Sequence, residues 1–180
     1  YVMGLLSADQ TICEKMTARD PLFFSGFALE KNAVHFAIEL MDFGLYDEAR
    51  NILTQADDGA MKFYYLAELE SRCSNYDLVK DHIHLADTSD WACEFPCRVE
   101  SIDVLKRAGT PMADYYLGCI YYHLERYEDA VSAWERTVKA IDFAPAYRNL
   151  ALGCFDHLNR PEDARAYLEQ AHKLLPESDR

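Results

Sequence analysis

The stretch Pro111–Asp142, PMADYYLGCIYYHLERYEDAVSAWERTVKAID, reads as two amphipathic helices joined by a tight turn. Residues three and four apart on a helix lie on neighbouring turns of one face. Leu117, Gly118 and Tyr121 therefore share one face of the first helix. This spacing predicts that the two helices pack against each other along that face.

The second helix of the stretch carries Ala130 and Trp134 on one face, four residues apart. Gly118 and Ala130 are small, so the two helix backbones can approach closely. Tyr121 and Trp134 are large and fill the space beside the small residues. A pair of this size cannot bury its apolar face alone, so we expect neighbouring pairs to supply the core.

The same pattern recurs along the chain and predicts further helix pairs. Ala164 follows Ala130 by 34 residues, whereas Ala151 follows Gly118 by 33. The turn between the two helices of the last pair should therefore be one residue longer than the turn of the preceding pair. We expect pairs at 32–43 with 46–56, at 60–73 with 76–86, and at 144–157 with 161–175. The residues that define the pattern are Ala37, Ala49, Ala67, Leu117, Gly118, Tyr121, Ala130, Trp134, Ala151, Ala164 and Leu168.

One step of the pattern is too long for a single repeat. Gly118 lies 51 residues after Ala67, which exceeds a repeat of about 34 residues by half a repeat. We therefore expect one unpaired helix at 97–108, which Gly109 ends. The expected layout is a partial repeat and connection at 1–31, two degenerate pairs at 32–90, a loop and the extra helix at 91–110, two clear repeats at 111–176 and a tail at 177–180.

These pairs resemble tetratricopeptide (TPR) repeats. Two positions depart from that pattern: Thr137 stands where a small residue is usual, and Asp142 stands where proline is common. The resemblance implies an all-α fold, a right-handed α-solenoid of antiparallel helix pairs. It also implies an interaction module rather than an enzyme, with no cofactor.

Three strings also resemble the repeat-bearing tail of large bacterial proteins of unknown function. The strings are GLYDEARNIL at 44–53, EFPCRVESIDVLKRA at 94–108, and YYLGCIYYHLERYEDAVSAWERTV at 115–138 with AYRNLALGCF at 146–155. This second resemblance implies that a carbohydrate-enzyme-like β-domain precedes the tail. The alternative function is therefore an accessory tail of a carbohydrate-active enzyme, which aids dimerisation or substrate access.

Charge limits the classes of partner. The net charge of the 180-residue chain is −13, so a polyanion would be repelled, and nucleic acid and anionic membrane are poor partners. No apolar run is long enough to span a bilayer. The sequence begins at Tyr1 without an initiator methionine, and we interpret it as a fragment of a longer protein.

The cysteines and the acidic residues indicate no chemical site. Six scattered cysteines fit a reducing cytoplasm without a disulfide framework: Cys13, Cys73, Cys93, Cys97, Cys119 and Cys154. A zinc site at His82, His84, Cys93 and Cys97 is disfavoured, because the two histidines are two apart on a helix and point to different sides. The acidic pairs at 128–129 and 162–163 open helices, where negative charge is favourable.

A partner is expected on the inner stripe formed by the first helices of the pairs, either an extended peptide or a helix of the same protein. Tyrosine and arginine on this stripe are frequent binding hot spots. An equally weighted alternative is that the tyrosines only pack against adjacent helices. The candidate residues are Tyr64, Glu68, Arg72, Tyr115, Cys119, Tyr122, His123, Arg148, Leu152 and Phe155.

Self-association is a separate expectation. A truncated repeat array exposes apolar surface at its end. Leu5, Leu6 and the stretch LFFSGF at 22–27 would form that surface, so a homodimer through this region is expected.

The central stretch generates a first testable prediction. If the indole of Trp134 fills the space between the two helices, Trp134→Ala should lower the free energy of unfolding by about 3–5 kcal/mol. Chemical denaturation of both proteins measures the difference. A loss below about 1 kcal/mol, which is usual for surface positions, would place this side chain outside the core.

Overall fold

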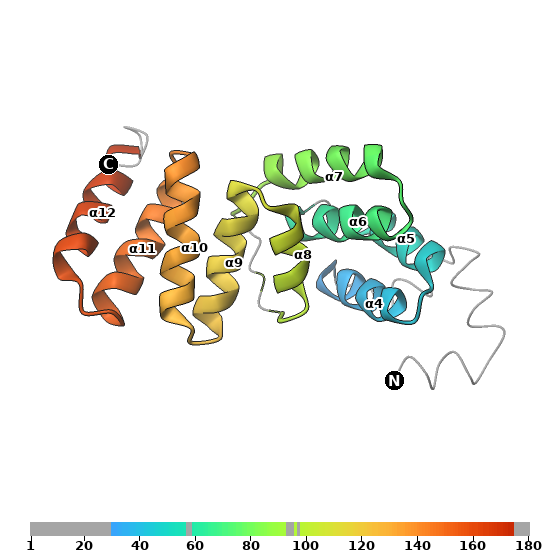
Figure 1. The fold of residues 1–180 in the computed structure, drawn as a ribbon, viewed down its shortest axis with the longest axis horizontal. Coiled ribbons are helices and arrows are strands. Elements are labelled where there is room, and N and C mark those ends of the chain that lie inside the picture. Colours follow the sequence, from blue (N-terminus) through green and yellow to red (C-terminus); the bar gives the residue numbers. More distant parts are fainter. Residues whose placement is uncertain (1–29, 57–58, 93–95, 97, 175–180) are drawn as a thin grey trace. The chain divides into compact units, whose positions relative to one another are not determined.

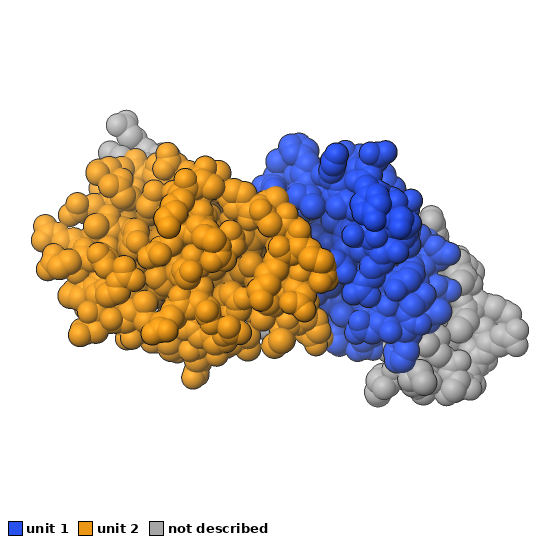
Figure 2. Space-filling view, viewed as in Figure 1, with its two compact units in different colours: residues 1–94 blue, residues 95–180 orange. Residues whose placement is uncertain are grey.

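The computed structural model describes residues 30–56, 59–92, 96 and 98–174, and every regular element in that part of the chain is an α-helix. The chain divides into two compact units, residues 1–94 and 95–180 (Figure 2). The expected homodimer surface at Leu5, Leu6 and 22–27 lies outside the described residues.

The described part of unit 1 contains two helix pairs. Its helices are α4 (Glu30–Asp42), α5 (Tyr46–Gln55), α6 (Ala60–Arg72) and α7 (Tyr76–Thr88). Helix α4 packs against α5 and α6 against α7, and α6 also contacts both helices of the first pair. Ala37, Ala49 and Ala67 are buried between these helices.

Unit 2 contains one extra helix followed by two pairs. Its helices are α8 (Ser101–Ala108), α9 (Pro111–His123), α10 (Tyr127–Ala140), α11 (Ala144–Asp156) and α12 (Pro161–Leu174). They follow one another side by side, with α8 against α9, α9 against α10, α10 against α11, and α11 against α12 (Figure 1).

The predicted all-α fold of antiparallel helix pairs with one extra helix is confirmed. The extra helix begins at Ser101 and not at residue 97, because a turn precedes it in which the Ser101 N–H donates to the Arg98 carbonyl at 3.2 Å. Gly109 ends this helix in the left-handed region, with φ of 63°.

The turns within the four pairs share one backbone arrangement. One turn residue shortly before the second helix has positive φ in each pair: Gly44 at 75°, Ser74 at 63°, Glu125 at 59° and Asn159 at 52°. The next N–H donates back to the first helix, from Leu45 to Leu40, from Asn75 to Glu70, from Arg126 to Tyr121 and from Arg160 to Cys154. The last of these bonds spans one more residue than the others, so the last turn is longer by one, as the spacing predicts.

Gly118 and Trp134 form the closest contact of the α9–α10 pair. A Cβ atom on Gly118 would lie 2.2 Å from Nε1 of Trp134, so only glycine leaves room for the indole. The ring is 2% exposed, and its N–H donates to the carbonyl of Tyr115 at 3.1 Å. The buried polar group of the ring is therefore satisfied by the helix against which it packs.

The pattern residues are buried, with one exception. Leu168 occupies the position of Trp134 one repeat later but is 53% exposed, because no described helix follows α12. Thr137, which departs from the TPR pattern, is fully buried. Its hydroxyl donates to the carbonyl of Pro111 at 3.1 Å, so this polar residue is accommodated between α9 and α10.

Gly118→Ala should destabilise the chain by about 1–3 kcal/mol, because the new methyl group would overlap a rigid buried indole. Gly153→Ala is the comparison variant in α11, where a Cβ would lie 2.9 Å from Cγ2 of Val131 and 3.6 Å from the Trp134 ring. Alanine also favours a helix over glycine by about 0.5–1 kcal/mol at both sites, so the loss at Gly153, where the overlap is smaller, should be the lesser of the two. Chemical denaturation compares the two, and an equal loss at both sites would contradict the close contact.

Candidate functional site

Three of the ten candidate partner residues belong to unit 1, and two of these are buried. The Tyr64 hydroxyl donates to Oδ1 of Asp87 at 2.6 Å, which ties α6 to α7. Glu68 is also buried and pairs with the exposed guanidinium of Arg72, Nε to Oε1 at 2.8 Å. Tyr64 and Glu68 are thus buried, whereas the sequence pattern predicted that they lie on an open stripe.

In unit 2 the stripe on α9 is partly covered by α11 and the residues beside it: Tyr115 is buried, and Cys119 and Tyr122 are half-buried. The ring of Tyr115 is 8% exposed, with its edge against Phe143 at 4.9 Å between centroids. The amide nitrogen of Asn149 lies 4.0 Å from Sγ of Cys119. Tyr115 is thus a packing residue, and the expectation that it is open to a partner is corrected as well.

Burial also lowers the reactivity of Cys119, the cysteine on this stripe. It raises the pKa of Cys119 to about 11, more than hydrogen bonds involving Trp134 and Tyr115 lower it. The thiol is therefore protonated at neutral pH and is a poor nucleophile. Burial likewise raises the pKa of the Cys154 thiol.

An aromatic cluster lies at the C-terminal end of the α9 stripe. The Tyr122 hydroxyl lies 3.0 Å from Nε2 of His157. The His157 ring stacks on Tyr127, with centroids 3.5 Å apart and planes 3° from parallel. Sequence reasoning missed Tyr127 and His157, because they flank helix ends and no repeat spacing relates them.

The equivalent stripe on α11 is open. Arg148, Leu152 and Phe155 occupy the positions of Tyr115, Cys119 and Tyr122 one repeat later, and we call these three residues the α11 stripe. Leu152 is 41% exposed and Phe155 66% exposed, and Arg148 is also exposed. Helix α12 packs beside α11 and leaves these side chains exposed, and no described helix follows α12. His123 is exposed too, at the end of α9.

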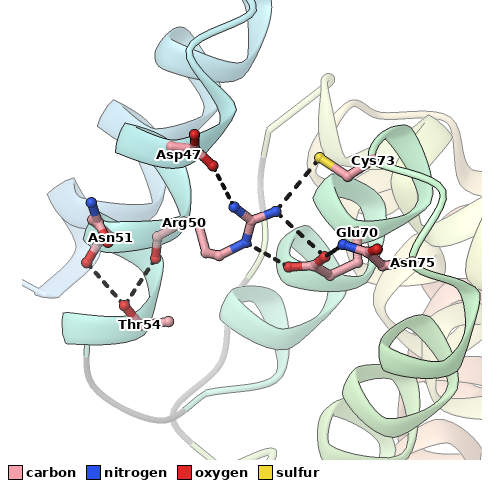
Figure 3. A network of polar contacts seen from close by, with 7 residues as sticks. All are labelled: Asp47, Arg50, Asn51, Thr54, Glu70, Cys73 and Asn75. Carbon is pink, nitrogen blue, oxygen red and sulfur yellow. Dashed lines mark hydrogen bonds and ion pairs between the residues drawn. The ribbon is translucent and has the colours of Figure 1, made fainter.

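A buried ion pair in unit 1 is the other concentration of charge (Figure 3). Nε of Arg50 donates to Oε1 of Glu70 at 2.7 Å, and a second guanidinium nitrogen contacts Asp47 at 2.8 Å. The amide of Asn75 donates to Oε2 of Glu70 at 2.7 Å. Cys73 also accepts a contact from the guanidinium, with its sulfur 3.5 Å away.

The shared turn geometry shows what is unusual about this pair. Glu70 occupies the place that Leu40, Tyr121 and Cys154 fill in the other pairs, and all four are buried. Burial alone would raise the pKa of Glu70, but the hydrogen bonds from Arg50 and Asn75 outweigh it and hold the pKa below 4.5, its ordinary value. An ionised, fully bonded carboxylate that joins α5 to α6 acts as a structural tie.

Metal and membrane sites find no support in the described residues. No group of three or more histidine, cysteine or acidic side chains there could hold a metal ion. His82 stacks on Phe63 at 6.4 Å, His84 is exposed, and Cys93 and Cys97 lie outside the described residues. None of the described helices has both the length and the apolarity needed to cross a membrane.

Comparison with known proteins gives a weak likeness. No family model matches the chain. A crystal structure of MamA is 18% identical, with 88% of this chain and 85% of that chain covered and a TM-score of 0.39. A structure of MamA AMB-1 is 15% identical, with 81% and 91% covered and a TM-score of 0.39. At these scores the likeness decides nothing about function, and the all-α fold is established by the helices themselves.

The Arg50–Glu70 pair generates a stability prediction. Arg50→Met leaves a buried carboxylate without its counter-charge and should cost about 3 kcal/mol. The double variant Arg50→Met with Glu70→Leu fills the place with an apolar group, as Leu40 does in the first pair, and should lie within about 1 kcal/mol of the wild type. Urea denaturation at neutral pH measures both, and a double variant as weak as Arg50→Met would contradict this interpretation.

The same pair predicts a pH dependence. Because the folded pKa of Glu70 is below its ordinary value of 4.5, its contribution is complete above that pH and is lost as the pH falls through the folded pKa. The wild type should therefore lose more stability below pH 4.5 than the double variant does. Identical acid profiles for the two would show that Glu70 is not stabilised in its ionised form.

Proposed function

We propose that the chain is a non-catalytic interaction module of TPR type that presents the α11 stripe to another polypeptide. The single observation behind this proposal is the contrast between two equivalent stripes. On α9, Tyr115 is buried and Cys119 and Tyr122 are half-buried, whereas Leu152 and Phe155 on α11 are exposed. Large apolar side chains gathered on one helix face gain free energy when a partner removes them from water.

The composition of the stripe supports binding to protein. Phe155 supplies a large rigid contact area, and Arg148 supplies a planar charged group, both of which are enriched at protein interfaces. The net charge of −13 disfavours nucleic acid and anionic lipid as alternatives.

The absence of catalysis is part of the proposal and is supported by the state of the candidate groups. Cys119 and Cys154 have pKa values raised by burial. Glu70 is bonded to Arg50 and Asn75 and acts as a tie. In the described residues these groups serve packing and leave no free nucleophile next to a base.

The wider setting is proposed from the sequence resemblance alone. We propose a cytoplasmic module from a longer bacterial protein. The alternative, an accessory tail of a carbohydrate-active enzyme, predicts a glycosidase-like β-domain encoded upstream of Tyr1. Sequencing the complete gene separates the two settings, and either is compatible with binding through the α11 stripe.

Site-specific photo-crosslinking tests the proposed function and requires no identified partner. A photoreactive amino acid at Phe155 should crosslink to a protein in cells that express the chain. The matched control places the same group at Phe43, which is 49% exposed in unit 1. Leu152→Asp should reduce the Phe155 adduct at least tenfold, because a carboxylate in the contact must be desolvated.

Two outcomes would contradict the proposed function. One is an adduct at Phe43 but none at Phe155. The other is a Phe155 adduct that Leu152→Asp leaves unchanged. Circular dichroism should show that both variants retain the helical content of the wild type, because the altered side chains are exposed.

A further inference from the structure

We infer that the polypeptide that covers the α11 stripe is a second copy of this chain, packed with its α11 antiparallel to the first. The inference rests on the proposed function, because it names the occupant of the same surface. It does not involve Leu5, Leu6 or residues 22–27, which the sequence predicts as a separate self-association surface.

The first step is the shape of the surface. Arg148, Leu152, Phe155 and Asp156 occupy positions i, i+4, i+7 and i+8 of α11, which form one face of a helix. All four are exposed. A helix face of this width suits a second helix laid along it, since packed helices meet through such rows of side chains.

The second step concerns the apolar surface of α12 next to this helix face. In the preceding pair, Tyr122 lies beside Trp134, with ring centroids 5.7 Å apart. Phe155 and Leu168 occupy these two positions one repeat later, so they are the equivalent neighbours, and both are exposed. The apolar area thus continues from α11 onto α12, as it does from α9 onto α10, where α11 packs.

The third step is the order of charge along the face. Arg148 lies at its beginning and Asp156 at its end, with the apolar residues Leu152 and Phe155 between them. Neither charged group makes an ion pair with another described residue. The face is therefore basic at one end, apolar in the middle and acidic at the other end.

Such a face is complementary to itself in one orientation. In a twofold dimer each residue contacts its counterpart reciprocally, so an antiparallel arrangement about Leu152 places Arg148 beside Asp156 of the second copy, twice. Leu152 then lies opposite Leu152 of the second copy, and each Phe155 lies opposite position 149, within one helical turn of that Leu152. A parallel arrangement would place like charges together at both ends, which is unfavourable. Charge order thus selects the antiparallel dimer.

The test exchanges the charges. Arg148→Glu places two acids together and Asp156→Arg places two bases together, so each variant should weaken dimerisation at least tenfold in analytical ultracentrifugation. The double variant restores opposite charges with reversed order and should return the dimerisation constant to within about threefold of the wild type. Phe155→Asp should abolish the dimer, whereas the control Phe43→Asp should not change it.

The outcomes separate this inference from the proposed function. A wild-type chain that stays monomeric at millimolar concentration, or a double variant that fails to restore the dimer, overturns the second copy as occupant. If the Phe155 photo-adduct then contains a different protein, the proposed function stands while this inference falls. If neither a dimer nor a Phe155 adduct forms, both fall. A wild-type dimer with restoration by charge exchange supports both.

Discussion

The contact between the indole of Trp134 and the bare backbone of Gly118 is the constraint on which unit 2 depends. At this point α9 and α10 approach closely, and the indole N–H is satisfied by a carbonyl of the opposite helix. The buried Thr137 hydroxyl bonds to the first turn of α9 in the same interface. With this pair held close, its remaining apolar side chains form the surface that receives α11.

The next level of structure follows from repetition. The same turn, with one left-handed residue and one bond back to the first helix, recurs in every described pair and places equivalent residues in equivalent positions. Equivalent positions need not have equivalent surroundings. Cys119 and Tyr122 contact α11 and its flank, whereas Leu152 and Phe155 are exposed. The surface proposed to bind a partner therefore corresponds to a surface that is packed between repeats elsewhere in unit 2, which accounts for its exposed apolar side chains.

Much of the fold was predictable from the sequence, because small residues at fixed intervals indicate where two helices pack closely against each other. The residue spacing predicted the extra helix and the longer last turn. The burial of individual side chains was harder to predict, because periodicity assigns a residue to a helix face but does not show which other elements pack on that face. Tyr64, Glu68 and Tyr115 were expected to be open for this reason, and all three are buried. Glu70 and His157 were missed because their partners, Arg50 and Tyr127, lie at distances in sequence that the repeat does not specify.

The central claim is that the equivalent stripes on α9 and α11 differ in solvent exposure. Hydroxyl-radical footprinting of the full chain measures this exposure directly. In dilute solution Leu152 and Phe155 should be oxidised much faster, relative to their intrinsic reactivity, than Tyr115, which is 8% exposed. Raising the protein concentration should slow oxidation of Leu152 and Phe155 and leave Tyr115 unchanged. Equal protection of the two stripes in dilute solution, or rapid oxidation of Tyr115, would contradict the account.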